Sequence, residues 1–67
     1  MYVSVAIDLA LDRLFTYEVP VELLGRVRVG QLLRVPFRGR VTRGFALSLD
    51  EKPPAFATKP VMAIEDE

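Results

Sequence analysis

The chain has 67 residues, of which 51% are hydrophobic and 27% charged. This size allows one small domain, and the composition provides enough apolar side chains for a core. There is no cysteine and no histidine, which excludes disulfides, zinc–thiolate sites and every catalytic mechanism that depends on an imidazole. No segment approaches the roughly 18 apolar residues of a membrane span, so we expect a cytoplasmic domain with no membrane association.

The basic residues are unevenly distributed along the chain. Nine basic and nine acidic residues cancel, but residues 23–49 carry +6 and the rest of the chain −6. This window contains no acidic residue and six arginines, namely Arg26, Arg28, Arg34, Arg38, Arg40 and Arg43. The planar guanidinium group matches phosphate and stacks on bases. Two interpretations stay open at this point: the solvated surface of a small barrel, and a strip that faces an anion.

Alternating apolar residues predict two strands in the N-terminal part of the chain. Residues 2–7 and 14–19 both have the period of two that is typical of a half-buried strand. Residues 8–13 between them are ambiguous, because apolar residues there also fall at helical spacing; we expect a loop, with a helix as the alternative. Pro20 ends the second strand because it has no N–H for a ladder.

The remainder of the chain predicts a hairpin and a short final strand. Gly25 and Gly30 bracket a turn-rich connector. Further strands are predicted at residues 32–37, 41–50 and 62–65. Arg38-Gly39-Arg40 forms the tight turn of the hairpin, with Gly39 at positive φ. The predicted fold class is therefore all-β, a small barrel-like sheet of about five or six short strands.

The same alternation predicts which side chains form the core. These are Val3, Val5, Ile7, Val35, Phe37, Phe45 and Leu47.

Motifs that could support catalysis are incomplete. Residues 25–30 have the glycine spacing of a phosphate loop, but Gln31 and Leu32 stand where the lysine and the hydroxyl residue must follow. The two serines have no base, and the carboxylates at residues 65–67 are best explained as an acidic tail. We therefore expect no catalytic residue and no metal site in this chain.

Phe15, Thr16 and Tyr17 are the most informative group in the second strand. Phe15 and Tyr17 lie two residues apart and point to the same side of the strand. If they face inward they belong to the core, and if one reaches a concave rim it provides a stacking platform for a base. Thr16 faces the opposite side, where its hydroxyl meets either a polar ligand or water.

Taken in order, several segments of the chain resemble one protein family. They are residues 11–17 with Pro20, Arg28-Val29-Gly30, and residues 33–37, 43–49 and 59–66. Together they resemble the N-terminal 3′-DNA-binding domain of PriA, the bacterial replication-restart helicase. The similarity extends over nearly the whole chain, so the resemblance implies a single domain, residues 1–67, that is the N-terminal fragment of a larger helicase.

The resemblance implies a function. In that family the domain captures the 3′-terminal nucleotide of a nascent strand at a stalled or abandoned replication fork and helps the helicase load the primosome. DNA with a 3′ end is then the direct partner, and single-stranded-DNA-binding protein and other primosome proteins are partners of the parent helicase. ATP, magnesium and zinc belong to parent domains that this chain lacks, so we expect no cofactor here and a location at the bacterial nucleoid.

The resemblance also implies which residues bind DNA. The family roles fall on Phe15, Thr16 and Tyr17, on the Arg38-Gly39 turn, and on Lys59. Two positions depart from the family pattern. Thr16 stands where the family usually has an aspartate, and a neutral hydroxyl is a weaker acceptor for a sugar hydroxyl than a carboxylate. Arg38 stands where the family usually has glycine, so it contacts a phosphate or crowds the pocket.

One alternative from a different functional class stays open. A small barrel of the SH3-like kind binds proteins through an apolar groove and has no role with nucleic acid. Titration with an oligonucleotide distinguishes the two hypotheses.

Overall fold

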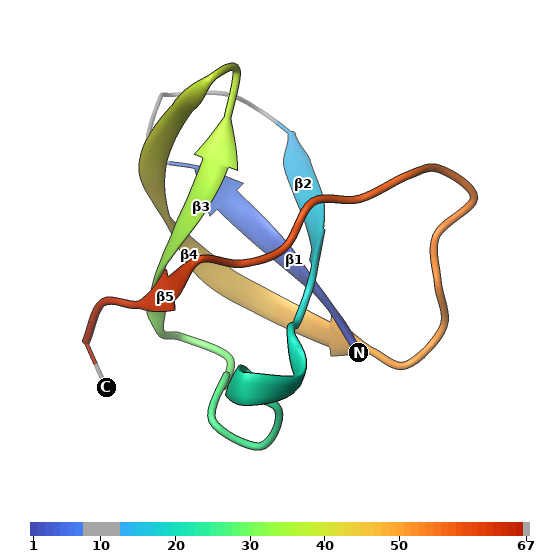
Figure 1. Cartoon of the computed structure of the whole chain (residues 1–67). Helices are drawn as coiled ribbons and strands as arrows, with labels where there is room; N and C mark the ends of the chain where they lie inside the picture. The colour runs from blue at the N-terminus through green and yellow to red at the C-terminus, as the bar shows by residue number, and fades with distance from the viewer. Residues whose placement is uncertain (8–12, 67) are drawn as a thin grey trace.

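Five antiparallel strands form one sheet in the computed structural model, which describes residues 1–7 and 13–66 (Figure 1). The strands are β1 (Tyr2–Ile7), β2 (Leu14–Glu18), β3 (Leu32–Phe37), β4 (Arg40–Asp50) and β5 (Ala63–Ile64). Their order in the sheet is β2-β1-β4-β3-β5. A short 3-10 turn, η1 (Val21–Leu23), follows β2. The predicted all-β class is confirmed, although the sheet is open and not closed into a barrel. In the described part of the chain, no helix has the length and apolarity needed to cross a membrane.

The strand boundaries agree closely with the alternation pattern. The strands predicted at residues 2–7 and 32–37 coincide with β1 and β3. The last predicted strand, residues 62–65, is shorter in the structure, where β5 is only two residues long. The loop or helix predicted for residues 8–13 lies outside the described residues except for Arg13.

The β3–β4 hairpin closes through a two-residue turn. Phe37 faces Arg40 in the ladder, and the two residues between them, Arg38 and Gly39, have φ angles of 51° and 76°. Positive φ at both central positions defines the type I′ turn, whose twist matches that of the flanking strands. The prediction for Gly39 is confirmed, and Arg38 adopts the same left-handed region without being glycine.

The C-terminal segment crosses from β2 to β3 (Figure 1). The Glu18 N–H donates to the Lys59 carbonyl at 3.0 Å, and the Val61 N–H donates to the Glu18 carbonyl at 2.9 Å. The Met62 N–H then donates to the Arg34 carbonyl at 2.8 Å. This segment therefore pairs first with the outer edge of β2 and then with the outer edge of β3, which protects part of both open edges.

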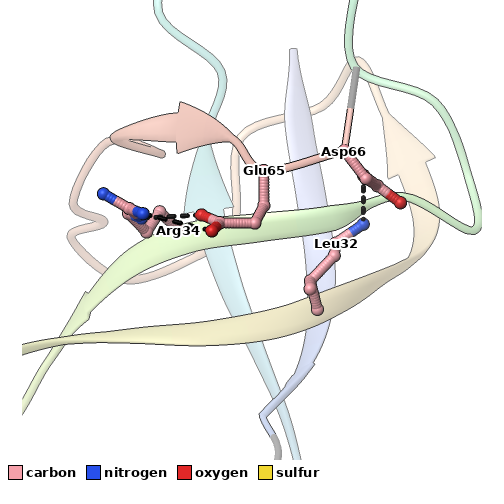
Figure 2. Close-up of polar contacts among 4 residues, drawn as sticks. All are labelled: Leu32, Arg34, Glu65 and Asp66. Atoms are coloured by element: carbon pink, nitrogen blue, oxygen red, sulfur yellow. Dashed lines mark hydrogen bonds and ion pairs between the residues drawn. The ribbon is translucent and has the colours of Figure 1, made fainter.

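Side chains hold the end of this segment on β3 (Figure 2). The Arg34 guanidinium donates to both carboxylate oxygens of Glu65, with N···O distances of 2.7 and 3.1 Å. The Asp66 carboxylate accepts from the Leu32 N–H at 2.9 Å. Both contacts join β3 to the chain just after β5, so they supplement the short ladder between these strands.

The core lies on one side of the sheet, beneath the connector and the C-terminal segment. It consists of Val3, Val5, Ile7, Tyr17, Val19, Leu23, Val27, Leu33, Val35, Ala46 and Val61. The four valine and isoleucine residues predicted for β1 and β3 are therefore confirmed as core. Phe37 is partly buried and packs against this cluster.

The core prediction for Phe45 and Leu47 is wrong, because each is 48% exposed. In β4 the inward positions are held by Gly44 and Ala46, both buried. A Cβ atom at Gly44 would overlap Cγ1 of Val5 and lie 2.8 Å from the carbonyl oxygen of Ala6. The Val5 side chain and the Ala6 backbone therefore leave no space for a side chain at Gly44. Alternation then turns the two larger side chains outward.

Candidate nucleic-acid interface

A pocket of about 780 Å³ lies between β2, the end of β3 and the loop before β5. Three segments that are distant in the sequence line it: residues 13–17, 36–38 and 56–59. Their positions can be followed in Figure 1 at β2, at the arrowhead of β3 and in the long loop beside β2. The crossing of the C-terminal segment described above brings the third segment to the first.

Aromatic rings provide the apolar part of the pocket. The rings of Phe15 and Phe37 meet edge to face, with centroids 4.9 Å apart and an interplanar angle of 70°. This is a favoured geometry for an aromatic pair, and both residues are half-buried. Phe56, from the loop, is 62% exposed. The pocket therefore presents ring surface that another planar group can contact.

Basic side chains provide its charge. The Arg13 guanidinium carbon lies over the Phe15 ring, 5.3 Å from its centroid. The Arg38 guanidinium carbon lies over the Phe37 ring at 5.1 Å. Lys59 also lines the pocket, and the lining includes no acidic residue among those described. An apolar hollow edged by charges of one sign raises the local concentration of anions.

The backbone of Thr16 also faces outward from the sheet, along the free edge of β2. The N–H of Glu18 donates to Lys59, and its C=O accepts from Val61. Backbone groups two residues apart in a strand point to the same side, so the N–H and C=O of Thr16 also point away from β1. Thr16 is opposite Ser4 in the ladder, and neither its N–H nor its C=O has a hydrogen-bond partner among the described residues. A backbone donor and an acceptor are thus available beside the Thr16 side chain.

Tyr17 has a structural position in the wall of the pocket. It is only 5% exposed, and its hydroxyl donates to the Pro36 carbonyl at 2.8 Å. Burial raises the pKa of this hydroxyl above its ordinary value, so it stays protonated and continues to donate. The bond ties β2 to the end of β3, and it leaves the buried ring with little face for stacking.

A second side-chain bond positions the loop. The Thr58 hydroxyl donates to the Glu18 carboxylate at 2.8 Å, next to the backbone bond between Glu18 and Lys59. Glu18 is partly buried and does not line the pocket. Its role is therefore to fix the backbone that carries Lys59.

The structure brings together five of the six residues that the sequence predicted as DNA-binding. Phe15, Thr16, Tyr17, Arg38 and Lys59 line the same pocket. Gly39 does not line it and lies in the adjoining turn, where its positive φ shapes the hairpin.

Sequence reasoning missed several residues of the pocket. Arg13, Phe37, Phe56 and Thr58 also line it. Phe56 could have been found from the sequence, because it is an aromatic residue in a proline-rich loop. A ring outside the strands is not expected in the core, so it is a candidate for ligand contact. The arginine window is divided in space among the connector, β3, the hairpin turn and β4, and only Arg38 of its members reaches the pocket. The described residues contain no group of three or more side chains that could hold a metal ion.

An open five-stranded sheet with an aromatic, basic pocket defines a small all-β domain suited to a ligand that has both a planar ring and a negative charge. Comparison with protein families identifies such a domain: the model of the PriA 3′ DNA-binding domain (3′BD) matches residues 4–67. The chain therefore belongs to the family of PriA 3′ DNA-binding domains. No curated protein and no solved structure matches it.

Proposed function

We propose that the pocket holds the 3′-terminal nucleotide of a DNA strand. The observation that carries the proposal is the pocket itself, in which residues from three segments combine aromatic rings with three basic side chains. Membership in a family of 3′ DNA-binding domains supports it.

The chemistry divides between the two kinds of residue. The base contacts the rings of Phe15, Phe37 and Phe56, a type of contact worth about 1–3 kcal/mol per base in single-strand binding. Arg13, Arg38 and Lys59 contact phosphate oxygens, and Thr16 contacts the sugar through its hydroxyl or its free backbone groups. Tyr17 and Glu18 hold these elements in place without touching the ligand extensively.

The charge of the domain favours recognition of an end over coating of a strand. The whole chain has no net charge, and its pocket presents three cations. A protein that tracks a long stretch of backbone neutralises many phosphates and needs a strongly basic surface. One or two phosphate contacts at a terminus fit the present balance better.

We place this activity in replication restart. In a parent helicase the domain would capture the 3′ end of the nascent strand at a stalled fork, near the nucleoid. Single-stranded-DNA-binding protein and other primosome components would act through that parent. The family resemblance of the sequence supports this context.

Binding to linear and circular single strands of equal length and sequence tests the proposal. A 5′-labelled linear strand with a free 3′ end should bind, and the unlabelled circle should compete poorly. The slope of log K against log salt should be about −0.7 to −1.4, corresponding to one or two phosphates. Lys59→Ala should weaken binding, whereas Arg28→Gln, a charge change outside the pocket, should not.

Two results would contradict the proposal. Equal binding of the circle, or a salt slope several-fold steeper, would mean that the domain binds backbone without regard to ends. No binding of any strand would favour a protein-interaction domain instead.

A further inference from the structure

We propose that residues 53–57 form a lid that closes the Phe56 ring over the nucleotide in the pocket. This inference rests on the proposed function, because the lid needs a planar ligand between its ring and the Phe15–Phe37 pair. It adds a conformational step to that function, since the loop that carries Phe56 is held only at its two ends.

Both ends of the loop are fixed to the sheet. At one end, β4 pairs with β1 as far as Asp50. At the other end, the Thr58 hydroxyl donates to the Glu18 carboxylate at 2.8 Å, and the Lys59 carbonyl accepts from the Glu18 N–H at 3.0 Å. Residues 53–57 therefore span the distance between two fixed points, and the loop extends outward beside β2 (Figure 1).

The part between these points has no hydrogen bond to the rest of the described chain. Pro53 and Pro54 have no N–H to donate, and their rings restrict the start of the loop. Phe56 stands between two alanines, and all three of these residues are exposed. A segment with few contacts and no hydrogen bonds changes its conformation at low cost. We therefore expect the motion of the loop at residues 55–57.

The Phe56 ring is placed to gain from closing. It lines the pocket, yet it is 62% exposed. Phe15 and Phe37 contact each other, whereas Phe56 forms no ring contact with a described residue. A nucleobase that stacks on the Phe15–Phe37 pair leaves its second face to water. Closing Phe56 over that face removes apolar surface of both rings from water.

Backbone order parameters from amide relaxation test the motion. In the free domain, the amides of residues 55–57 should have S² values below about 0.6, the range of flexible backbone. With a saturating 3′-ended strand they should approach about 0.85, the value of rigid backbone. The Val61 amide donates to the Glu18 carbonyl and is the control, with a high value in both states. Values near about 0.85 in the free domain, or low values in the complex, would overturn the lid.

A fluorescent variant tests where the ring goes. The chain contains no tryptophan, so Phe56→Trp introduces a single indole. Acrylamide should quench its fluorescence readily in the free domain and much less in the complex with a 3′-ended strand. Phe45→Trp is the matched control, because Phe45 is also exposed, at 48%, and does not line the pocket. Its quenching should be the same with and without the strand.

Removal of the ring measures what closure contributes to binding. Phe56→Ala should weaken binding of a 5′-labelled strand with a free 3′ end about 5- to 150-fold, the range for loss of one base–aromatic stack. Phe45→Ala removes an equal ring outside the pocket and should leave the affinity unchanged. Thermal melting of both variants shows that they are folded.

The failures of the two proposals are distinguishable. A linear strand that binds better than the circle but leaves the indole as accessible as before overturns the lid and leaves end recognition in place. Unchanged affinity of folded Phe56→Ala has the same meaning. A circle that binds as well as the linear strand and protects the indole overturns end recognition and leaves the lid. Equal binding of both strands without protection overturns both proposals.

Discussion

Arg38 has a strained backbone conformation, and its side chain lines the pocket. Its φ of 51° is in the left-handed region, which costs a residue with a Cβ roughly 1–2 kcal/mol. Its guanidinium lies over Phe37 and lines the pocket. A glycine here would remove the strain and also the charge. The turn alone favours asparagine, aspartate or glycine at this position, so the presence of arginine is explained better by its place in the pocket.

Thr16 offers the most direct test of the site. Thr16→Asp should tighten binding to a strand with a 3′-hydroxyl by about 1–2 kcal/mol, a factor of roughly 5–30, because a charged acceptor replaces a neutral one. It should weaken binding to a 3′-phosphate strand, since two negative groups would meet at short range. Fluorescence anisotropy with both strands measures the two changes.

Thr16→Asn is the matched control, because it has the shape of aspartate without the charge. Its affinities for the two strands should stay close to those of the parent protein. Unchanged affinity of a folded Thr16→Asp variant for both strands would show that the terminus does not lie against β2.

Gly44 limits the packing of β4 against β1. Gly44→Ala would place a methyl group against Cγ1 of Val5 and 2.8 Å from the Ala6 carbonyl oxygen. Overpacking of this kind costs about 1–3 kcal/mol, which is a large fraction of the stability of so small a domain. Urea unfolding should show a lower midpoint with an unchanged slope.

Ser48→Ala, on the exposed part of the same strand, is the control for that experiment and should have little effect. A Gly44→Ala variant as stable as the parent would mean that β1 and β4 separate easily at this point.

Among the secondary-structure elements, β5 is the shortest strand, and side-chain contacts just after it help to hold it on β3. It is two residues long, and its attachment to β3 includes the Arg34–Glu65 pair. The hydrogen bond from Arg34, with its positive charge, holds the pKa of the Glu65 carboxyl below the ordinary value of 4.5. A carboxyl whose pKa is lower in the folded state stabilises the fold above its unfolded pKa, and that contribution disappears as the pH falls through the folded pKa.

We therefore expect the attachment of β5 to weaken in acid. The Glu65 N–H donates to the Leu32 carbonyl at 2.8 Å, so its hydrogen-exchange protection, corrected for intrinsic rate, should fall as the pH drops below about 4.5. The Ala46 amide, which donates to the Gln31 carbonyl, should be protected over a wider range. Glu65→Gln should reduce the protection at neutral pH and weaken its pH dependence. Constant protection of the Glu65 amide down to pH 2 would contradict this account.

At the scale of the whole molecule, the alternation of apolar residues predicted where the strands lie better than it predicted which face of each strand is buried. β1 and β3 were predictable because Val3, Val5 and Val35 alternate with more polar or smaller neighbours. The orientation of β4 was not predictable, because alternation favours burying the face that carries Phe45 and Leu47, and this face is exposed. The inward face carries Gly44, where a Cβ atom would overlap the Val5 side chain. Such a close approach is a property of the packed sheet and leaves no periodic signal.

The candidate site, too, was predictable only in part. Phe15, Thr16 and Lys59 were identified through a family resemblance, and the structure brings them into one pocket. Arg13 and Phe56 were missed because neither lies in a strand with a periodic pattern. Their proximity results from the crossing of the C-terminal segment, which pairs residues about 40 positions apart in the chain, such as Glu18 and Thr58.

The pocket is assembled from three segments that meet only in the folded sheet, so the unfolded chain has no equivalent of it. Folding and ligand binding are then thermodynamically linked: a ligand at 100 times its Kd should stabilise the domain by about 2.7 kcal/mol. For a domain of this size, that should raise the Tm by about 10–20 °C, which differential scanning fluorimetry with a 3′-ended oligonucleotide measures. An unchanged Tm at saturating ligand would mean that the unfolded chain binds equally well.

The linkage between folding and binding also determines how a destabilised variant binds the ligand. Gly44→Ala alters no group that lines the pocket, so its folded molecules should bind with the parent affinity. Its apparent Kd should rise only by the reciprocal of the folded fraction. Well below its Tm the variant should bind like the parent protein, and near its Tm the ligand itself should refold it.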